Sequence, residues 1–324
     1  GAQGASGTAG TSGTSGTAGS SGTAGTSGMT FKSTSTSSIQ LTPNPCGEPI
    51  NIVAVRHNGY IVGNTLWQDP YPGGTFTQNS ALTIFPNCAN NSSNGRYLIA
   101  GGTDTGVYYS KDTGVTWNYN DVYSAATYKD VAVSYNGGTM AALSDSSSKT
   151  GSNYRIIISH NYGDSFSLYQ TIAPSTDGDP NFVAVSGNGT YVLTATGNLS
   201  NGCGGGKVFS NTAQTLDLNS SVQFIDGAIS YYGQYMVIVG RTCTPTVKGR
   251  IYVSSNYGAS GSWNLNLDLG TLPPPVLITN SSIYAVCMSG NGKYMLGAFY
   301  GTTNSTKYYE IVYSSDYGLT WTLG

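Results

Sequence analysis

Two aspartates in one short loop segment are the first candidates for chemistry. Asp177 and Asp179 stand in STDGDPN, and paired carboxylates can hold Ca²⁺. A calcium ion takes about six to eight oxygen ligands, so two carboxylates favour a polar turn over a metal site. The two histidines, His57 and His160, are expected in separate exposed turns. We therefore expect neither a metal site nor a cofactor.

Five cysteines are the next candidates. None forms a CxxC pair, so the sequence does not favour zinc. We predict the disulfides Cys46–Cys88 and Cys203–Cys243, because the first two lie in irregular Pro/Asn-rich segments and the other two occupy the same place in neighbouring repeats. Cys287 lies in an apolar segment and is expected as a free, buried thiol. The alternative is that all five thiols are reduced.

The composition is poor in charge, with 9% charged residues and a net charge of -2. The absence of a basic patch argues against a nucleic-acid partner, because phosphates are held by clustered Lys and Arg. The chain has no apolar run near the ~20 residues that a membrane-spanning helix needs. It begins at Gly1 without a signal peptide, and we interpret it as a mature or partial product whose secretion signal is missing.

Seven N-x-S/T sequons can accept N-linked glycans if the chain is secreted. Together with the cysteines they favour an extracellular location, either secreted or on a cell or virion surface. The candidate acceptors are Asn90, Asn91, Asn188, Asn198, Asn219, Asn280 and Asn304.

Glycine occupies every third position of residues 1–28 without a break. Only glycine fits at the crowded axis of a triple helix, whereas a flexible linker needs no such period. We therefore predict a collagen-like stalk that joins three copies into a homotrimer. The stretch has neither proline nor charge, so we expect neighbouring subunits or sugars on its threonines to reinforce it. Its glycines are Gly1, Gly4, Gly7, Gly10, Gly13, Gly16, Gly19, Gly22, Gly25 and Gly28.

A repeated hairpin pattern follows the stalk. Each copy has two apolar segments around Asn-Gly or a variant of it, and Asn-Gly between apolar residues is a strong hairpin signal because both turn positions take φ > 0. The copies are 53–62, 92–101, 131–143, 183–195, 228–240 and 286–298.

A second pattern follows each hairpin. It is complete in YYSKDTGVTW (108–117) and VYSSDYGLTW (312–321), diverged in 157–166, 208–218 and 252–263, and worn in WQDPYPGGTF (67–76). It resembles the Asp-box, S-x-D-x-G-x-T-W, of sialidase-type β-propellers, in which the acidic or amide side chain accepts backbone hydrogen bonds in its own loop. The matching residues are Ser110, Asp112, Gly114, Thr116, Trp117, Asn161, Gly163, Asn256, Gly258, Ser314, Asp316, Gly318, Thr320 and Trp321.

The resemblance implies an all-β fold and calls for a test of sialidase activity. A hairpin plus an Asp-box hairpin gives one four-stranded antiparallel blade. We expect six blades, or seven with an irregular first blade. The domains are then 1–28 stalk, 29–50 linker with a possible closing strand, and 51–324 propeller.

Sialidases use three arginines and a Tyr–Glu pair, but the only glutamates here are Glu48 and Glu310, so we expect no enzymatic activity and no catalytic residue.

Three functions remain as hypotheses. The first is a structural subunit of an extracellular filament or surface fibre that assembles with itself through the stalk and the propeller, because similar repeats and stalks are familiar in surface proteins of protists, algae and their large viruses. The second is a glycan-binding adhesin whose trimeric stalk adds avidity. The third is a sialidase-like glycosidase.

Overall fold

The computed structural model describes the repeat region in segments. These are residues 67–68, 77–78, 86–103, 106–122, 126–145, 153–197, 206–217, 222–242, 247–271, 280–303 and 306–323. The predicted stalk and linker, residues 1–50, lie outside them.

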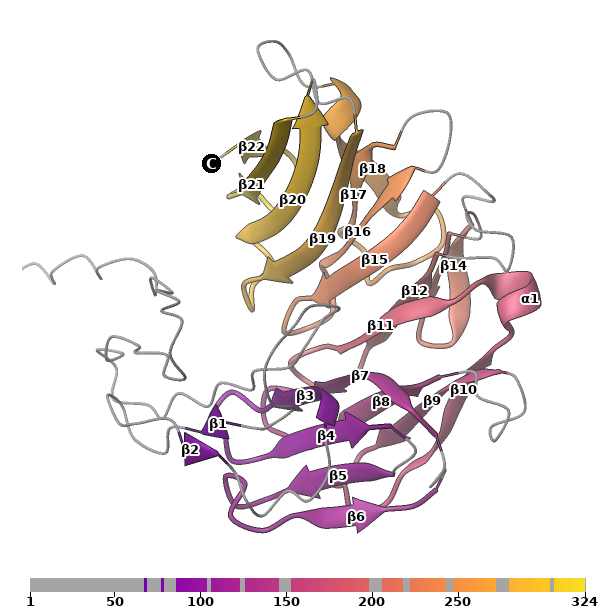
Figure 1. Ribbon diagram of the computed structural model, residues 1–324, viewed down its shortest axis with the longest axis vertical. Helices are drawn as coiled ribbons and strands as arrows, with labels where there is room; N and C mark the ends of the chain where they lie inside the picture. The colour runs from indigo at the N-terminus through magenta and orange to yellow at the C-terminus, as the bar shows by residue number, and fades with distance from the viewer. Residues whose placement is uncertain are drawn as a thin grey trace, which may run out of the picture. The chain divides into compact units, whose positions relative to one another are not determined.

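The described residues form an all-β β-propeller architecture with five four-stranded antiparallel sheets, which we call blades I to V (Figure 1). Within each blade the strands A, B, C and D pair in chain order. Blade I has β3 (Pro86–Asn91), β4 (Leu98–Gly102), β5 (Val107–Ser110) and β6 (Asn118–Asn120). Blade II has β7 (Tyr128–Val133), β8 (Met140–Ser144), β9 (Tyr154–Ser159) and β10 (Ser167–Ile172).

The remaining blades repeat this order. Blade III has β11 (Pro180–Val185), β12 (Val192–Thr196), β13 (Lys207–Ser210) and β14 (Ala213–Asp217). Blade IV has β15 (Val222–Ile229), β16 (Met236–Thr242), β17 (Gly249–Ser254) and β18 (Trp263–Asp268). Blade V has β19 (Asn280–Met288), β20 (Met295–Thr303), β21 (Thr306–Ser314) and β22 (Thr322–Leu323). Two short helices, α1 (Pro174–Asp177) and the 3-10 helix η2 (Leu269–Thr271), follow the D strands of blades II and IV.

The number of four-stranded blades in the described residues is five, where we expected six or seven. A separate two-stranded pair precedes them, made of β1 (Trp67–Gln68) and β2 (Thr77–Gln78). The expected hairpin at 53–62 lies outside the described residues.

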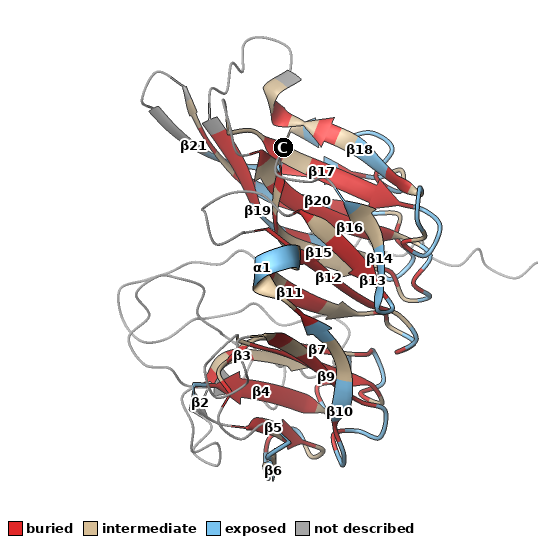
Figure 2. Cartoon of the chain, turned by 90° about the vertical axis from the view of Figure 1, so that its right-hand side faces the viewer, coloured by how far each residue is buried: buried red, intermediate tan, exposed pale blue. Residues whose placement is uncertain are grey.

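Apolar side chains fill the space between successive blades. The A strands of neighbouring blades lie side by side, β3 by β7, β7 by β11, β11 by β15 and β15 by β19. One cluster joins Ile99 of blade I to Met140 and Ile157 of blade II, and another joins blade IV to blade V. Buried residues run along the strands, whereas helix α1 buries none of its residues (Figure 2). Each blade therefore depends on its neighbours for its core.

The A–B turns are longer than the two-residue hairpins that Asn-Gly predicted. The turn of blade I runs from Ser92 to Tyr97, and only its glycine, Gly95, has a positive φ, of 65°. The reason is a buried serine: Ser92 Oγ donates to Asn94 Oδ1 at 2.9 Å and accepts from the Tyr97 backbone N–H at 3.0 Å. In the other four blades the backbone N–H of the Tyr or Thr that ends the turn likewise donates to a serine Oγ, at Ser134, Ser186, Ser230 and Ser289.

Backbone hydrogen bonds join the A–B turns of neighbouring blades. Ser93 N–H donates to Tyr135 O at 3.0 Å, and Tyr135 N–H donates to Gly187 O at 2.9 Å. From blade III onward, Asn188 N–H donates to Tyr231 O at 2.8 Å, and Tyr231 N–H donates to Gly290 O at 2.6 Å. These bonds fix the spacing of all five blades at one end of the sheets.

Candidate functional site

The C–D turns of blades I and V hold the hydrogen bonds that the Asp-box pattern implies. In blade I, Asp112 accepts from the Thr116 backbone N–H at 2.9 Å and from Thr116 Oγ1 at 2.5 Å, while Ser110 Oγ accepts from Gly114 N–H at 2.8 Å. Asp316 makes the same two contacts to Thr320 in blade V. Those bonds from Thr320, with one from Ser314, lower the pKa of Asp316 to about 2. Trp117 and Trp321 pack against the cores beside these turns.

The three diverged copies differ in a graded way. In blade II, Asn161 takes the place of the aspartate and accepts from Ser165 N–H at 3.0 Å. In blade IV, Ser254 Oγ still accepts from Gly258 N–H at 3.1 Å. Blade III has a two-residue turn instead, in which Asn211 and Thr212 both have positive φ, of 48° and 70°. A tight hairpin of the kind expected at the A–B turns therefore appears at this C–D turn.

Tyrosines join the C–D turn of one blade to the A–B turn of the blade before it. In blades II, IV and V the residue before the Asp-box glycine is a tyrosine with φ > 0, which is unusual for so bulky a side chain, and its ring packs on the tyrosine that ends the neighbouring A–B turn. Tyr257–Tyr191 and Tyr317–Tyr235 are stacked pairs with ring centroids 5.2 and 4.7 Å apart, and Tyr162–Tyr97 is a tilted pair at 4.7 Å. Because A–B and C–D turns lie at the same end of each sheet, we call this end the turn face.

Three further tyrosines form an exposed cluster on the turn face, which we call the tyrosine platform. Tyr135 of blade II lies 5.5 Å from Tyr231 of blade IV between ring centroids, and Tyr231 lies 4.8 Å from Tyr232. The platform crosses blade III because Gly187 has no side chain, and a Cβ there would come within 2.4 Å of the Tyr231 ring. Tyr135 and Tyr232 are 59% and 69% exposed. Nothing in the sequence distinguishes these tyrosines from the many that pack, except their place beside Asn-Gly or its variant.

Two aspartates on inner strands form the second candidate site. Asp130 in β7 and Asp226 in β15 each accept a backbone N–H of the next blade at 2.8 Å, from Val183 and Val286. Burial raises the pKa of Asp130 to about 7, and the charge of Asp226 adds to the rise, while the Val183 N–H opposes it. These carboxylates join blades, and one of them changes charge near neutral pH. Neither aspartate was predicted from the sequence, because an isolated Asp in an apolar strand has no distinguishing pattern.

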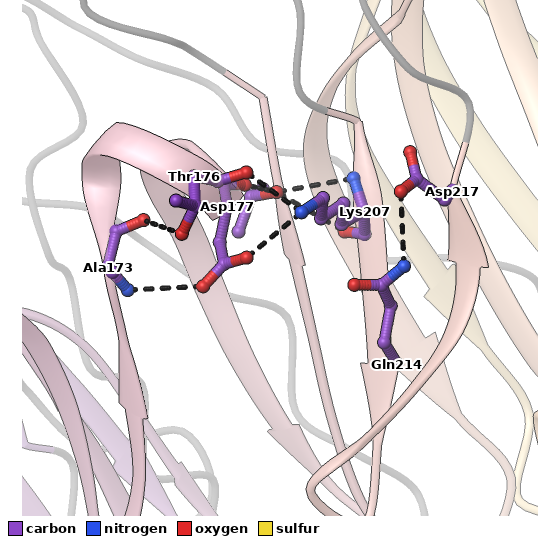
Figure 3. Close-up of polar contacts among 7 residues, drawn as sticks. Ala173, Thr176, Asp177, Lys207, Gln214 and Asp217 are labelled. Atoms are coloured by element: carbon purple, nitrogen blue, oxygen red, sulfur yellow. Dashed lines mark hydrogen bonds and ion pairs between the residues drawn. The ribbon is translucent and has the colours of Figure 1, made fainter.

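Asp177 has a structural role at the edge of blade III. It ends helix α1, and its carboxylate pairs with Lys207 Nζ at 3.0 Å and accepts the Ala173 backbone N–H at 3.3 Å (Figure 3). Lys207 Nζ also donates to Thr176 O at 2.8 Å. This arrangement matches the polar turn expected for STDGDPN. Across the residues that the structure describes, no group of three or more His, Cys, Asp or Glu side chains is placed to hold a metal ion.

The cysteines correct two expectations. Cys88 is a free, buried thiol that lies 3.7 Å from both Gly101 O and Tyr128 O, so the predicted Cys46–Cys88 disulfide is wrong. Its burial raises its pKa, which makes it a poor nucleophile. Cys287 is free as expected but exposed, because it lies on the side of β19 that faces away from blade IV. Cys46, Cys203 and Cys243 lie outside the described residues.

The predicted glycan acceptors lie in different settings. Asn90 and Asn91 are half-buried in β3, and their amide groups donate to Val131 O at 3.4 Å and Ser92 O at 2.8 Å. Asn188 is exposed on the turn face, and Asn280 begins β19. Asn198, Asn219 and Asn304 lie outside the described residues.

Sialidases need three convergent arginines, and three of the described arginines lie in two blades, Arg96 in blade I and both Arg241 and Arg250 in blade IV. Arg96 donates to Lys111 O at 3.1 Å, Arg241 to Gln223 at 2.8 Å and Arg250 to Asp268 at 3.0 Å, each within its own blade. Glu310 is exposed in β21 and lines a hollow of about 600 Å³ together with Tyr284, Phe299, Tyr300 and Tyr309. These arginines therefore do not converge on one carboxylate-binding site.

The sequence matches no protein-family model and no curated protein. Solved structures of β-propeller-like fold do resemble the chain. Hydrazine synthase of Kuenenia stuttgartiensis has a TM-score of 0.50 at 10% identity, over 81% of this chain and 92% of that one. The GH74 enzyme of Niastella koreensis has a TM-score of 0.48 at 12% identity, over 80% of this chain and 61% of that one. A PL25 ulvan lyase, a polysaccharide lyase, has a TM-score of 0.43 at 9% identity, over 72% and 67%. At these identities the likeness shows the fold alone.

These neighbours correct the expectation that the chain is not an enzyme. The structure with a TM-score of 0.50 is named as an enzyme, hydrazine synthase, so a fold of this kind is no argument against catalysis. No helix within the described segments is long and apolar enough to cross a membrane.

The Asp-box turns predict a stability difference between two substitutions of one residue. Asp112→Ala removes the acceptor of both Thr116 bonds and should lower the free energy of unfolding by about 1–2 kcal/mol. Asp112→Asn should cost less than half as much, because Asn161 accepts the equivalent backbone bond in blade II. Urea unfolding measures both, and equal costs for the two variants would contradict this role.

Asp130 predicts a pH dependence of stability. Folding raises the pKa of Asp130 from 3.8 to about 7, so between these two pH values the native state binds more protons than the unfolded state. The stability that this group contributes therefore falls as the pH rises from 3.8 to about 7. Asp130→Asn keeps an acceptor for the Val183 N–H and loses the titration. Its stability relative to the unmodified protein should therefore rise from pH 4 to pH 7 and then level off.

Urea unfolding at several pH values, read by tyrosine and tryptophan fluorescence, measures this difference. The exposed Asp121→Asn is the matched control for the loss of one surface carboxylate. A parallel curve for Asp130→Asn would show that Asp130 is ionised throughout.

Proposed function

We propose that the propeller is a carbohydrate-binding head and that the tyrosine platform holds the sugar. The observation that carries the proposal is the exposure of Tyr135 and Tyr232 around the Tyr231 ring, across three blades of one face. Exposed aromatic clusters of this kind are rare on surfaces that bind nothing, because their burial against a partner is favourable.

The chemistry of tyrosine suits a sugar ligand. The C–H groups of a pyranose carry slight positive charge and pack against the electron-rich ring face, while the phenol O–H can bond to sugar hydroxyls. Tyrosine also loses little conformational entropy on binding, because its side chain has two rotatable bonds. The chain has only 9% charged residues, so we propose a neutral glycan as the ligand.

Polar groups on the turn face can complete such a site. Asn188 and Gln234 are exposed in the A–B turns of blades III and IV, and the Asn188 N–H donates to Tyr231 O in the platform. Their amides offer donors and acceptors without charge. If Asn188 carries a glycan of its own, that glycan would stand beside the platform and compete with an outside ligand.

A glycan array with the full chain, followed by titration with the sugar found, tests the proposal. Tyr135→Ala and Tyr232→Ala should each weaken binding about tenfold, the equivalent of about 1.4 kcal/mol, because each removes a stacking surface. Tyr232→Phe should keep most of the affinity. Tyr119→Ala is the control, since Tyr119 is 48% exposed but lies on the outer strand of blade I.

Thermal unfolding should be unchanged in the platform variants, because these rings are largely exposed. A blank array, or platform variants that bind as tightly as the unmodified chain, would overturn the assignment.

The sequence supports a setting for this head. We propose an extracellular protein, secreted or on a cell or virion surface, in which the stalk at residues 1–28 joins three heads. Three linked platforms would bind a multivalent glycan surface far more tightly than one. The support is the unbroken glycine period and the sequons.

Self-assembly into a filament is the second candidate, and the same glycine period supports it. Replacing Gly13 or Gly16 with valine should abolish trimers, because a larger residue does not fit at the axis of a triple helix. Light scattering gives the mass, electron microscopy shows filaments or single trimers, and thermal unfolding should show an intact head. Trimers that survive the substitution would make the stalk a simple tether.

A further inference from the structure

The outer edge of β21 in blade V is left open by a short D strand. β21 has nine residues, Thr306–Ser314, but β22 has two and pairs only with Val312 and Tyr313. Among the described residues, no strand pairs with the outer edge of Thr306–Ile311. Blades II, III and IV differ, because their D strands pair along nearly the whole C strand. Blade V therefore has an open sheet edge six residues long.

This edge is regular enough to act as a template for another strand. β20 and β21 pair without a bulge from the pair Met295 and Ser314 to the pair Thr303 and Thr306, whereas the A–B pairs of all five blades contain a bulge. The segment TKYYEI has no proline, and most of its residues are β-branched or aromatic. A row of backbone N–H and C=O groups along such an edge readily pairs with an extended chain.

An aromatic hollow lies beside the open edge. It has a volume of about 600 Å³, and its lining includes Tyr284 of β19, Tyr300 of β20, and Tyr309 and Ile311 of β21. The rings of Tyr300 and Tyr309 lie 5.1 Å apart between centroids. Tyr309 and Ile311 are 75% and 53% exposed. Side chains of a strand added beside β21 would pack directly on these two residues, since opposite residues of paired strands lie about 5 Å apart at Cβ.

We propose that blade V binds an extended peptide segment of a partner protein by adding it as a strand to the outer edge of β21. The backbone of Thr306–Ile311 supplies the hydrogen bonds, and the hollow takes a bulky apolar side chain of the peptide. Sites that add a strand combine affinity and specificity in this way. The edge carries one charge of each sign, from Lys307 and Glu310, so the peptide that suits it best is neutral.

Fluorescence anisotropy with a labelled peptide tests the proposal in the full-length protein. The probe is the neutral peptide acetyl-TWTVTV-amide, which alternates hydroxyl and apolar side chains and should bind saturably. Two N-methylated forms, blocked at the odd or at the even residues, keep every side chain. One of them should bind at least about tenfold more weakly than the other, because only one set of N–H groups points at β21.

Equal binding of the two methylated peptides would show adsorption to an apolar surface and would overturn the proposal. Failure of the unmethylated peptide to bind would overturn it as well.

Substitutions on the edge locate the bound peptide. Tyr309→Asp and Ile311→Asp place a charge beneath the added strand and should each weaken peptide binding about tenfold. Both side chains are largely exposed, so thermal unfolding should be unchanged. Val115→Asp is the matched control, since Val115 is 70% exposed in blade I. Edge variants that bind the peptide as tightly as the unmodified chain would contradict this site.

Hydrogen exchange identifies what occupies the edge. In the free protein the outward amides of Thr306–Ile311 should exchange rapidly, and the peptide should slow them. Val312 and Tyr313, which already pair with β22, should change little.

Two patterns of exchange would overturn the proposal. Protection without peptide that rises with protein concentration would show that a second copy occupies the edge. Protection that does not depend on concentration would show that another segment of the same chain occupies it. None of these readouts depends on glycan binding, so failure here leaves the platform hypothesis to its own test.

Discussion

Contact between neighbouring blades is the interaction on which the rest of the structure depends. A four-stranded sheet with two apolar faces cannot exclude water from both by itself, so each blade depends on contact with its neighbours. The backbone bonds from Ser93 to Tyr135 and from Tyr135 to Gly187 set the spacing of the blades, and the clusters around Ile99 and Val237 fill the gaps. Asp130 and Asp226 join neighbouring blades on the inner strands as well, because each side-chain carboxyl accepts a backbone N–H of the next blade.

The fold class and the repeats were accessible from the sequence because they rest on local chemistry. A serine, an acid or amide and a glycine at fixed spacing bond to their own loop, so Asp112 and Asn161 are recognisable wherever they occur. The length of the A–B turn was not accessible in the same way. Its geometry depends on a buried serine such as Ser186, whose importance appears only when its burial is known.

Features that depend on contacts between distant residues were missed or mistaken. Cys88 looked like a disulfide partner, but its thiol is enclosed beside Gly101 and Tyr128, which lie in two different blades. The tyrosine platform requires Tyr135 and Tyr231 to meet across a glycine of a third blade, and no spacing along the chain encodes that meeting. Tyrosine therefore has two roles on the turn face, as a stacked joint between blades and as an exposed surface.

Blade III shows what happens when one half of a stacked joint is lost. Its C–D turn is cut to two residues, and the A–B turn of blade II ends in Thr139 where its neighbours end in tyrosine. Thr139 instead donates to Gly189 O at 3.2 Å. The two rings are thus absent together between blades II and III, so neither turn leaves a tyrosine without a ring to pack on. In any homologue, a shortened loop at one blade should accompany a smaller residue in the blade before it.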